Sequence, residues 1–299
     1  MGINSETAAF LCEARRGGAS FRHVLTLGRQ NLNTPRAVLE ELARANGVDG
    51  AALSSFGDYC EPFFEAFLGA ECVDSVDNSD YEGATFTHDM NQPVPASFEQ
   101  RYDAVVDGGT LEHIFNFPVA LANCMRMVRT GGRVFIFTPA NNQLGHGFYQ
   151  FSPELFYRTL SREHGFDVER MLAVQFRYSG TEHGALAGHY RVIDPAAVGS
   201  RITLVNSRPV TLMVQAVKRE HLADPFARAP QQSDYSQAWK AEEGGDAPVP
   251  PRTVLGKLRS PARLAKRLLP EAVGARLRNE FDRLFVHSFR NRDFYTRVD

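Results

Sequence analysis

The sequence predicts an α/β protein with a doubly wound, mostly parallel, seven-stranded sheet, an antiparallel last strand and a C-terminal helical tail. Short apolar runs alternate with helical patterns, which is typical of a parallel sheet covered on both faces. The last two apolar runs, 166–176 and 210–217, have no helical pattern between them, which favours an antiparallel hairpin at the sheet edge. After Arg219 the chain becomes rich in Pro, Gln, Ser, Asp and Gly, as linkers often are.

The expected elements follow one another in the order that such a sheet requires. Strands are predicted at 21–27, 72–76, 85–88, 102–106, 134–138, 166–176 and 210–217. Helices are predicted at 4–16, 34–46, 62–68, 117–129 and 152–164, and a loop at 178–200. Thr34 is expected to cap its helix, with Pro35 in the first helical position. The predicted units are a domain at 1–219, a linker at 220–251 and a tail at 252–299.

Composition and cysteine usage favour a cytoplasmic globular protein. The 299 residues are 43% hydrophobic and 23% charged, which is ordinary for a globular domain. No basic start precedes an apolar run, and no apolar run approaches the roughly 18 residues of a spanning helix. The four cysteines form no CxxC pair and fit no metal template, so reduced thiols are expected.

The basic charge is concentrated in the predicted tail. Residues 252–299 hold twelve Lys/Arg against five Asp/Glu, a net of +7, whereas residues 1–251 have a net of −9. A solvated face, or a helix at 271–290 docked on the domain, would account for this pattern. The alternatives are peripheral attachment at the inner membrane surface and an oligomer contact. A second tail helix is predicted at 261–269.

One long stretch resembles a known family. It reads "RYDAVVDGGTLEHIFNFPVALANCMRMVRTGGRVFIFTPANNQLGHGFYQFSPELFYRTLSREHGF" over 101–166. The order of its parts is similar to the second half of class I S-adenosylmethionine-dependent methyltransferases, in particular the type 11/23-like members. Those parts are a strand starting near Asp, a turn with "LEH", a helix, a Gly-Gly turn, an apolar strand ending in "TP" and a "FSPELF" helix. The resemblance covers about 20–218 and implies a Rossmann-like fold.

The resemblance implies S-adenosylmethionine as cofactor, bound at the carboxyl ends of the first parallel strands. Asp77 stands at the end of the second strand, with Asn78 beside it, where the family's acidic residue accepts hydrogen bonds from the ribose. Asp89 follows the third strand, at the place that meets adenine, with Met90 as an apolar contact. The alternative for Asp77 is a loop aspartate that caps the next turn.

The glycine-rich turn of the family is incomplete. In "VLTLGRQNLNT" at 24–34, Gly28 holds the first glycine position, whereas Gln30 and Leu32 hold the other two. A missing glycine removes both the room for close approach and the tolerance of positive φ. The loop is therefore expected to bind the cofactor differently or not at all, and Arg29 and Gln30 are expected to contact its carboxylate with their side chains.

The turn after the fourth strand carries the candidate acid–base residues. By resemblance, Asp107 and Gly108 line the methyl side of the cofactor. Glu112 and His113 are candidate catalytic residues, because methylation of a hydroxyl needs a proton acceptor near neutral pH. The alternative is that both stabilise the turn. No metal is expected, since no HExxH or similar spacing occurs.

Two loops are expected to cover the site. His146 and Tyr149 lie after the fifth strand and could close over it, and "EHGALAGHYR", with His183 and His189, is a second candidate lid. Surface loops are the alternative for both.

Two functions from different classes fit these patterns. The first is transfer of a methyl group from S-adenosylmethionine to a small molecule or to a sugar or glycan precursor. The second is a methyltransferase-like scaffold without activity that acts through protein or membrane-surface contacts. A nucleic-acid partner is not expected, because the body is acidic and no basic groove with interleaved aromatic residues is evident.

Overall fold

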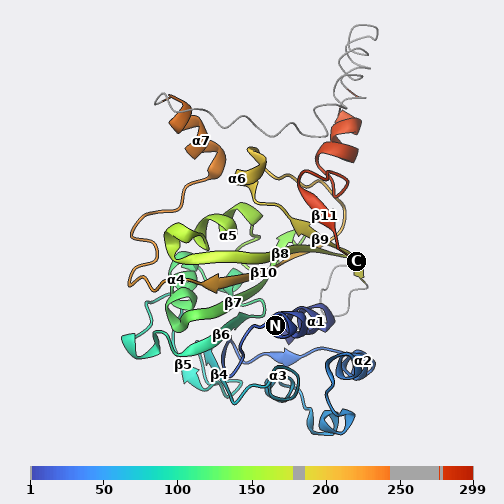
Figure 1. Ribbon diagram of the computed structural model, residues 1–299, viewed down its shortest axis with the longest axis vertical. Coiled ribbons are helices and arrows are strands. Elements are labelled where there is room, and N and C mark those ends of the chain that lie inside the picture. The colour runs from blue at the N-terminus through green and yellow to red at the C-terminus, as the bar shows by residue number, and fades with distance from the viewer. Residues whose placement is uncertain (1, 178–185, 243–275, 277–278, 299) are drawn as a thin grey trace.

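A nine-stranded mixed sheet forms the centre of the molecule (Figure 1). The structure is a computed structural model that describes residues 2–177, 186–242, 276 and 279–298. The strands are β2 (His23–Leu27), β4 (Cys72–Asp77), β5 (Phe86–Thr87), β6 (Tyr102–Asp107), β7 (Val128–Asn141), β8 (Phe166–Phe176), β9 (Leu186–Val192), β10 (Val210–Lys218) and β11 (Tyr295–Arg297). Their order across the sheet is β11-β9-β8-β10-β7-β6-β2-β4-β5.

The sheet divides into a parallel half and an antiparallel half. Strands β5, β4, β2, β6 and β7 pair in parallel, and β10, β8, β9 and β11 pair antiparallel. All seven predicted strands are present, so the α/β class with a parallel core is confirmed. The prediction of seven strands and one edge hairpin is wrong, because β9 and β11 extend the sheet beyond β8.

The two extra strands were missed for a physical reason. β9 lies in the range that was predicted as loop, and its sequence "LAGHYRV" holds a glycine and three charged or titratable side chains instead of a clean apolar alternation. β11 is three residues long and pairs with β9 through Tyr295 and Val192. Such short edge strands are specified by their partner strand more than by their own sequence.

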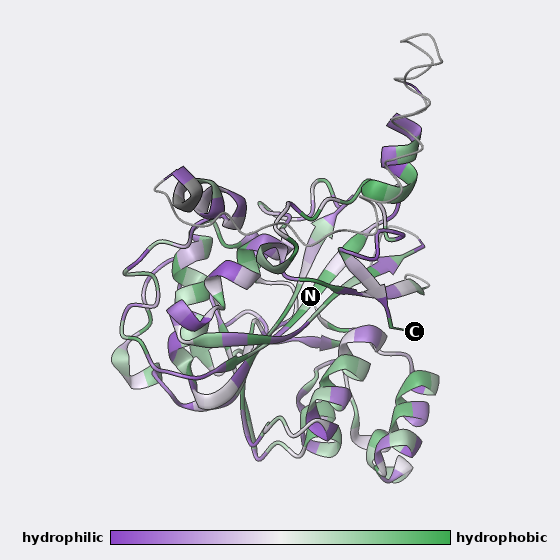
Figure 2. Ribbon diagram, turned by 45° about the horizontal axis from the view of Figure 1, so that its top comes forward, coloured by the Kyte–Doolittle hydropathy of each residue, from purple (hydrophilic) through white to green (hydrophobic). Residues whose placement is uncertain are grey.

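Helices cover both faces of the sheet. They are α1 (Ser5–Arg16), α2 (Arg36–Asn46), α3 (Glu61–Leu68), α4 (Phe117–Met127), α5 (Pro153–Thr159), α6 (Pro195–Val198) and α7 (Ser233–Glu242). One buried cluster contains Phe10 of α1 and Phe63 of α3, and the other contains Leu121 of α4 and Phe156 of α5. In Figure 2 the helices carry stretches of both colours, as helices with one apolar face do. The doubly wound arrangement is thereby confirmed.

Two helix starts show how local sequence and tertiary contacts compete. Asn4 caps α1, since its side chain accepts a hydrogen bond from the backbone N–H of Thr7 at 3.0 Å. Thr34 does not cap α2, and Pro35 holds the N-cap position without a side-chain bond. The Thr34 hydroxyl donates to the carbonyl of Ile3 at 2.9 Å instead. Ile3 belongs to the two-stranded sheet of β1 (Gly2–Ile3) and β3 (Asn31–Leu32).

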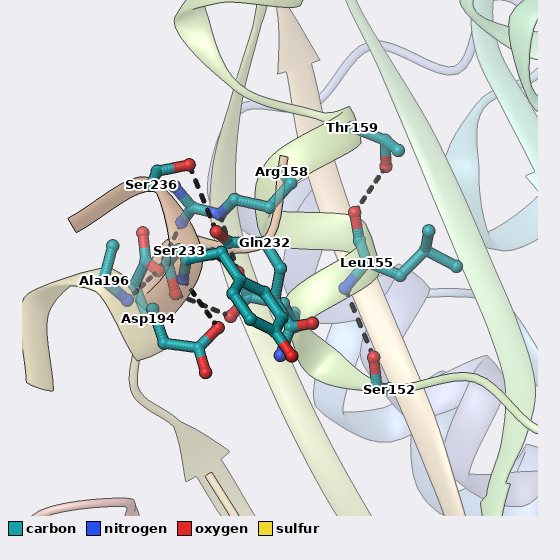
Figure 3. Close-up of polar contacts among 12 residues, drawn as sticks. Ser152, Leu155, Arg158, Thr159, Asp194, Ala196, Gln232, Ser233 and Ser236 are labelled. Carbon is teal, nitrogen blue, oxygen red and sulfur yellow. Dashed lines mark hydrogen bonds and ion pairs between the residues drawn. The ribbon is translucent and has the colours of Figure 1, made fainter. Parts of the chain in front are cut away.

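The range predicted as linker contains a helix that contacts the domain. α7 begins at Ser233, whose backbone N–H and hydroxyl both donate to the Glu154 carboxylate, at 2.7 Å and 3.0 Å. Glu154 also pairs with Arg158, and Arg158 binds Asp194 at the start of α6 (Figure 3). These contacts hold 233–242 against α5 and α6.

Only part of the predicted tail lies within the described residues. The helix expected at 261–269, and the beginning of the one expected at 271–290, lie outside them. A π-helical turn, Asp282–Val286, precedes β11, which joins the main sheet. Among the described residues, no helix is long and apolar enough to cross a membrane.

Lys218, at the end of β10, is a buried cation whose removal should weaken the fold. Its ammonium donates to the carbonyls of Met125 and Val128, at 2.7 Å and 2.8 Å. We expect Lys218→Met to lower the free energy of unfolding by about 1–2 kcal/mol near neutral pH, because both carbonyls lose their donor.

The deficit of Lys218→Met, which is the difference between its free energy of unfolding and that of the wild type, should grow with pH. Burial lowers the pKa of Lys218 from 10.5 to about 8. Between those values the unfolded chain holds a proton that the folded chain has released, so raising the pH stabilises the folded wild type but not Lys218→Met. Urea denaturation of both proteins at about pH 7 and about pH 9.5 measures this difference. A deficit that is the same at both pH values would contradict the expectation.

Candidate functional site

A cleft opens where the parallel strands end. β2, β4, β5 and β6 are parallel, so their carboxyl ends share one edge of the sheet. The cleft at this edge has a volume of about 440 Å³, within the range of ligand sites. Its lining residues are Leu27, Val76, Asp77, Asn78, His88, Asp89, Met90, Asn91, Thr110, His113 and Ile114. This lining includes the end of β2 and the turn that follows β6. Between these two strands the chain order reverses, and open α/β sheets bind ligands at such points.

Asp77 and Asn78 enter this cleft from the end of β4. The Asp77 carbonyl accepts a hydrogen bond from the His88 N–H at 2.8 Å, which joins the two walls of the cleft. One carboxylate oxygen of Asp77 accepts from the backbone N–H of Asn78 at 2.6 Å. The Asp77 side chain thus makes a hydrogen bond within its own loop, which is the kind of contact that the alternative interpretation as a capping aspartate expects. Asp77 also lines the cleft.

Asp89 and Met90 form the neighbouring wall, after β5. The Asp89 carboxylate accepts from the backbone and side-chain amides of Asn91, at 2.9 Å and 2.8 Å. These bonds, the backbone one first, lower the pKa of Asp89, so the group is anionic near neutral pH. Met90 is buried and packs into the core beneath the cleft.

The glycine loop does not line the cleft in the way that the family pattern implies. Gly28 has a φ of +68°, which favours glycine, and its N–H donates to Val76 at 2.8 Å. Arg29 turns away from the cleft: its guanidinium binds Glu61 at 2.7 Å and lies 3.9 Å above the ring of Tyr59. The expected contact between Arg29 and a cofactor carboxylate would have to replace these interactions.

Gln30 fills the space beside β6. Its side chain is completely buried, and its amide nitrogen donates to the carbonyl of Leu27. Its amide oxygen has no hydrogen-bond partner among the described residues. A Cβ atom at Gly108 would overlap this amide group. Gly108 therefore accommodates Gln30, and neither residue lines the cleft.

Asp107 lies under the turn that follows β6. One carboxylate oxygen accepts the N–H groups of Thr110 and Leu111, at 2.7 Å and 3.3 Å. The other oxygen is buried without a hydrogen-bond partner in the described chain. Burial, and next the charge of Glu112, raise the pKa of Asp107 well above its ordinary value. Asp107 does not line the cleft, so its place supports a structural role in the turn.

Glu112 is a buried carboxylate at the end of the same turn. It is 1% exposed, and one oxygen accepts a hydrogen bond from the hydroxyl of Thr138 on β7, at 3.2 Å. The other oxygen accepts no hydrogen bond within the described residues and lies 3.5 Å from Nε2 of His146. The structure therefore brings Glu112 close to His146, which lies in the loop after β7, the parallel neighbour of β6.

His113 is exposed and is the catalytic candidate that lines the cleft. Its ring centre lies 5.4 Å from that of His146. Beyond them stand two exposed aromatic side chains, Phe115 and Phe148, with ring centres 5.9 Å apart. Tyr149 joins the two loops by donating from its hydroxyl to the Phe115 carbonyl at 2.6 Å. This pair of loops forms an apolar lip next to the histidines.

The second candidate lid is placed elsewhere. His183 lies outside the described residues, and His189 belongs to β9, where it contacts Glu6 of α1 at 2.7 Å. His189 thus joins the sheet to a helix and does not cover the cleft.

Six lining residues escaped the sequence interpretation, namely Leu27, Val76, His88, Asn91, Thr110 and Ile114. Each lies at the carboxyl end of a predicted strand or in the turn that follows it. The carboxyl ends of parallel strands meet at one edge, so this position could have indicated them.

The comparisons with known proteins give a match of fold at low identity. No family model and no curated protein matches the chain. YcgJ of Bacillus subtilis is similar at 11% identity, over 72% of this chain and 99% of that one, with a TM-score of 0.39. A SAM-dependent methyltransferase from Archaeoglobus fulgidus is similar at 15% identity, over 72% and 94%, with a TM-score of 0.38.

A third similar structure is 1,6-didemethyltoxoflavin-N1-methyltransferase of Burkholderia thailandensis, which holds 1,6-didemethyltoxoflavin and S-adenosylhomocysteine. It shares 16% identity over 72% of this chain and 78% of that one, with a TM-score of 0.36. At these identities and TM-scores the likeness carries no argument about activity.

Proposed function

We propose that this protein transfers a methyl group from S-adenosylmethionine to a small molecule. The observation that carries the proposal is the cleft at the carboxyl ends of β2, β4, β5 and β6. Asp77 stands there at the end of β4, the strand next to β2, where a carboxylate can accept hydrogen bonds from two ribose hydroxyls. Asp89 and Met90 offer a polar and an apolar contact for adenine on the adjoining wall.

The residues fit the cofactor on one side of the cleft only. At the ribose and adenine side, Asp77, Asn78 and Asp89 are accessible. At the glycine loop, the Gln30 side chain fills the room beside Gly108. When bound, S-adenosylmethionine supplies an electrophilic methyl group. This chain's own contribution is to orient the cofactor through Asp77 and to hold the acceptor beside His113.

The lip next to His113 supports an acceptor with an apolar part. Phe115 and Phe148 are 72% and 67% exposed, although large aromatic side chains are usually covered. Such side chains bind flat or apolar groups. A small molecule that combines a ring with a nucleophilic group therefore fits this surface better than a bare sugar does. His113, or Glu112 behind it, would accept the proton that the acceptor loses.

Asp77→Ala should weaken the binding of S-adenosylmethionine roughly tenfold or more, because a charged hydrogen-bond partner of the ligand is lost. Isothermal titration of the wild type and the variant with S-adenosylmethionine and S-adenosylhomocysteine measures this. Asp80→Ala is the matched control, since Asp80 is an exposed carboxylate in the same loop that does not line the cleft. Equal affinities in all three proteins would remove Asp77 from the site.

A second function is favoured by Gln30. Its side chain occupies the loop where close approach is needed, which supports a scaffold that has lost the cofactor and acts through protein contacts. Absence of any binding by folded wild-type protein would favour this second function.

The same titration, repeated on Gln30→Gly, tests whether the Gln30 side chain blocks the cofactor. If Gln30 blocks the cofactor, Gln30→Gly should bind S-adenosylmethionine more tightly than the wild type does, because the variant restores the glycine and vacates the space. Affinity that is unchanged in Gln30→Gly would show that Gln30 does not block the cofactor.

A further inference from the structure

Glu112, His113 and His146 form a cluster whose donor atoms all lie within 4.8 Å of one another. Two imidazoles and one carboxylate are the ligand set that zinc and other first-row divalent metals prefer. We propose that these three side chains bind a divalent transition-metal ion, with Zn²⁺ as its representative, at the edge of the cleft.

The first support is the state of the Glu112 carboxylate. It is 1% exposed, and the oxygen that faces His146 accepts no hydrogen bond from the described residues. A buried carboxylate oxygen that accepts no hydrogen bond is costly, and a metal ion would satisfy it. Two ligands of a tetrahedral zinc site stand about 3.4 Å apart when each bond is about 2.1 Å. The Glu112 Oε1 to His146 Nε2 distance of 3.5 Å agrees with that spacing.

The second support is the way in which the ligands are held. The Thr138 hydroxyl donates to the other Glu112 oxygen, as outer partners of metal-binding carboxylates do. The loop of His146 is attached to Glu112 itself: the N–H groups of Phe148 and Tyr149 donate to the Glu112 carbonyl, at 2.7 Å and 3.3 Å. Gly147, with a φ of +75°, has no room for a Cβ atom against this carbonyl. His146 is therefore kept beside Glu112.

The third support is the open side of the cluster. Three protein ligands leave at least one coordination position free, which is typical of metal sites that act on a ligand. His113 is exposed and lines the same cleft as Asp77, so a bound ion would lie at the edge of this cleft. Coordination of an acceptor oxygen there would rest on the proposed function, and with the ion bound Glu112 and His113 would serve as ligands instead of proton acceptors. Binding of the ion itself does not rest on that function.

Metal binding is tested on the full chain, freed of metal by a chelator and titrated with Zn²⁺ in a calorimeter. We expect one ion per chain with micromolar or tighter affinity. His113→Ala and His146→Ala should each weaken binding roughly 100-fold or more, because each removes a direct ligand. Both histidines are exposed, so their variants should fold, which circular dichroism checks.

His23→Ala is the matched control, since His23 is an exposed histidine at the opposite end of β2. Its affinity should equal that of the wild type. Titration with Co²⁺ adds a spectroscopic readout, since visible bands of a bound Co²⁺ ion should appear in the wild type and disappear in His146→Ala. The proposal is overturned if the wild type binds no Zn²⁺, or if both His113→Ala and His146→Ala keep wild-type affinity.

The outcome is independent of the cofactor. Zinc binding without S-adenosylmethionine binding would leave the metal site standing and remove the proposed methyl transfer. The reverse result would remove the metal site alone.

Discussion

Asp103→Ala should lower the free energy of unfolding by about 2–4 kcal/mol, because one buried carboxylate joins three parts of the sheet. Asp103 is 4% exposed and stands on β6. Its oxygens accept hydrogen bonds from the Ser20 hydroxyl at 2.8 Å and from the backbone N–H of His23 at 3.0 Å. They also pair with the guanidinium of Arg129 on β7. Alanine leaves the N–H of His23 without this acceptor.

Urea denaturation measures this loss, with Asp103→Asn as a graded comparison. Asparagine keeps one acceptor oxygen but has no charge. The loss of unfolding free energy in Asp103→Asn should therefore lie between zero and the loss in Asp103→Ala. Asp58→Ala, a substitution of an exposed aspartate, is the control for removal of a carboxylate from the surface. An Asp103→Ala protein as stable as the wild type would mean that the contacts of Asp103 contribute nothing net.

Gly108→Ala should lower the free energy of unfolding by about 1–3 kcal/mol, because the added methyl group overlaps the buried amide of Gln30. The Gln30 side chain cannot leave easily, since it is completely buried and bonded to Leu27. In a Gln30→Ala background the methyl group has room, so the same glycine substitution should cost little. The expected signature is a coupling energy of about 1–3 kcal/mol in the double-mutant cycle.

Gly57→Ala is the control for this cycle. A Cβ atom there meets nothing within 4 Å, so the substitution should be nearly neutral. If Gly108→Ala costs the same in both backgrounds, Gln30 is not what makes glycine necessary at 108. The result also bears on the cofactor, because it measures how firmly Gln30 occupies the space beside the cleft.

The candidate site divides into a part that sequence could predict and a part that it could not. Asp77, Asp89 and His113 were predicted from the family resemblance together with their places after strands, and the structure brings all three to one cleft. Arg29 and Gln30 follow a strand in the same way, yet they turn to Glu61 and Leu27. Strand order gives the edge at which a residue lies, but the partners that are in reach decide where its side chain turns.

The proposed metal ligands show the same division. Glu112 and His113 were singled out for acid–base work, and His146 for a lid, without any connection between them. β6 and β7 are parallel neighbours, so the loops after them adjoin. Backbone bonds from Phe148 and Tyr149 to Glu112 then set the spacing of the three side chains. No sequence spacing carries that information, since the ligands come from two loops.

The sequence by itself determined the α/β class, the seven main strands and their alternation with helices, because apolar periodicity reports burial locally. It also determined the acidic residues at the ends of β4 and β5. Only the tertiary structure decided that β9 and β11 extend the sheet, since β9 lacks a clean apolar alternation and β11 is only three residues long, so that both depend on their partner strands. The tertiary structure also decided that Gln30 fills the room beside Gly108. Such filling depends on how side chains from distant segments share a volume, which local pattern does not encode.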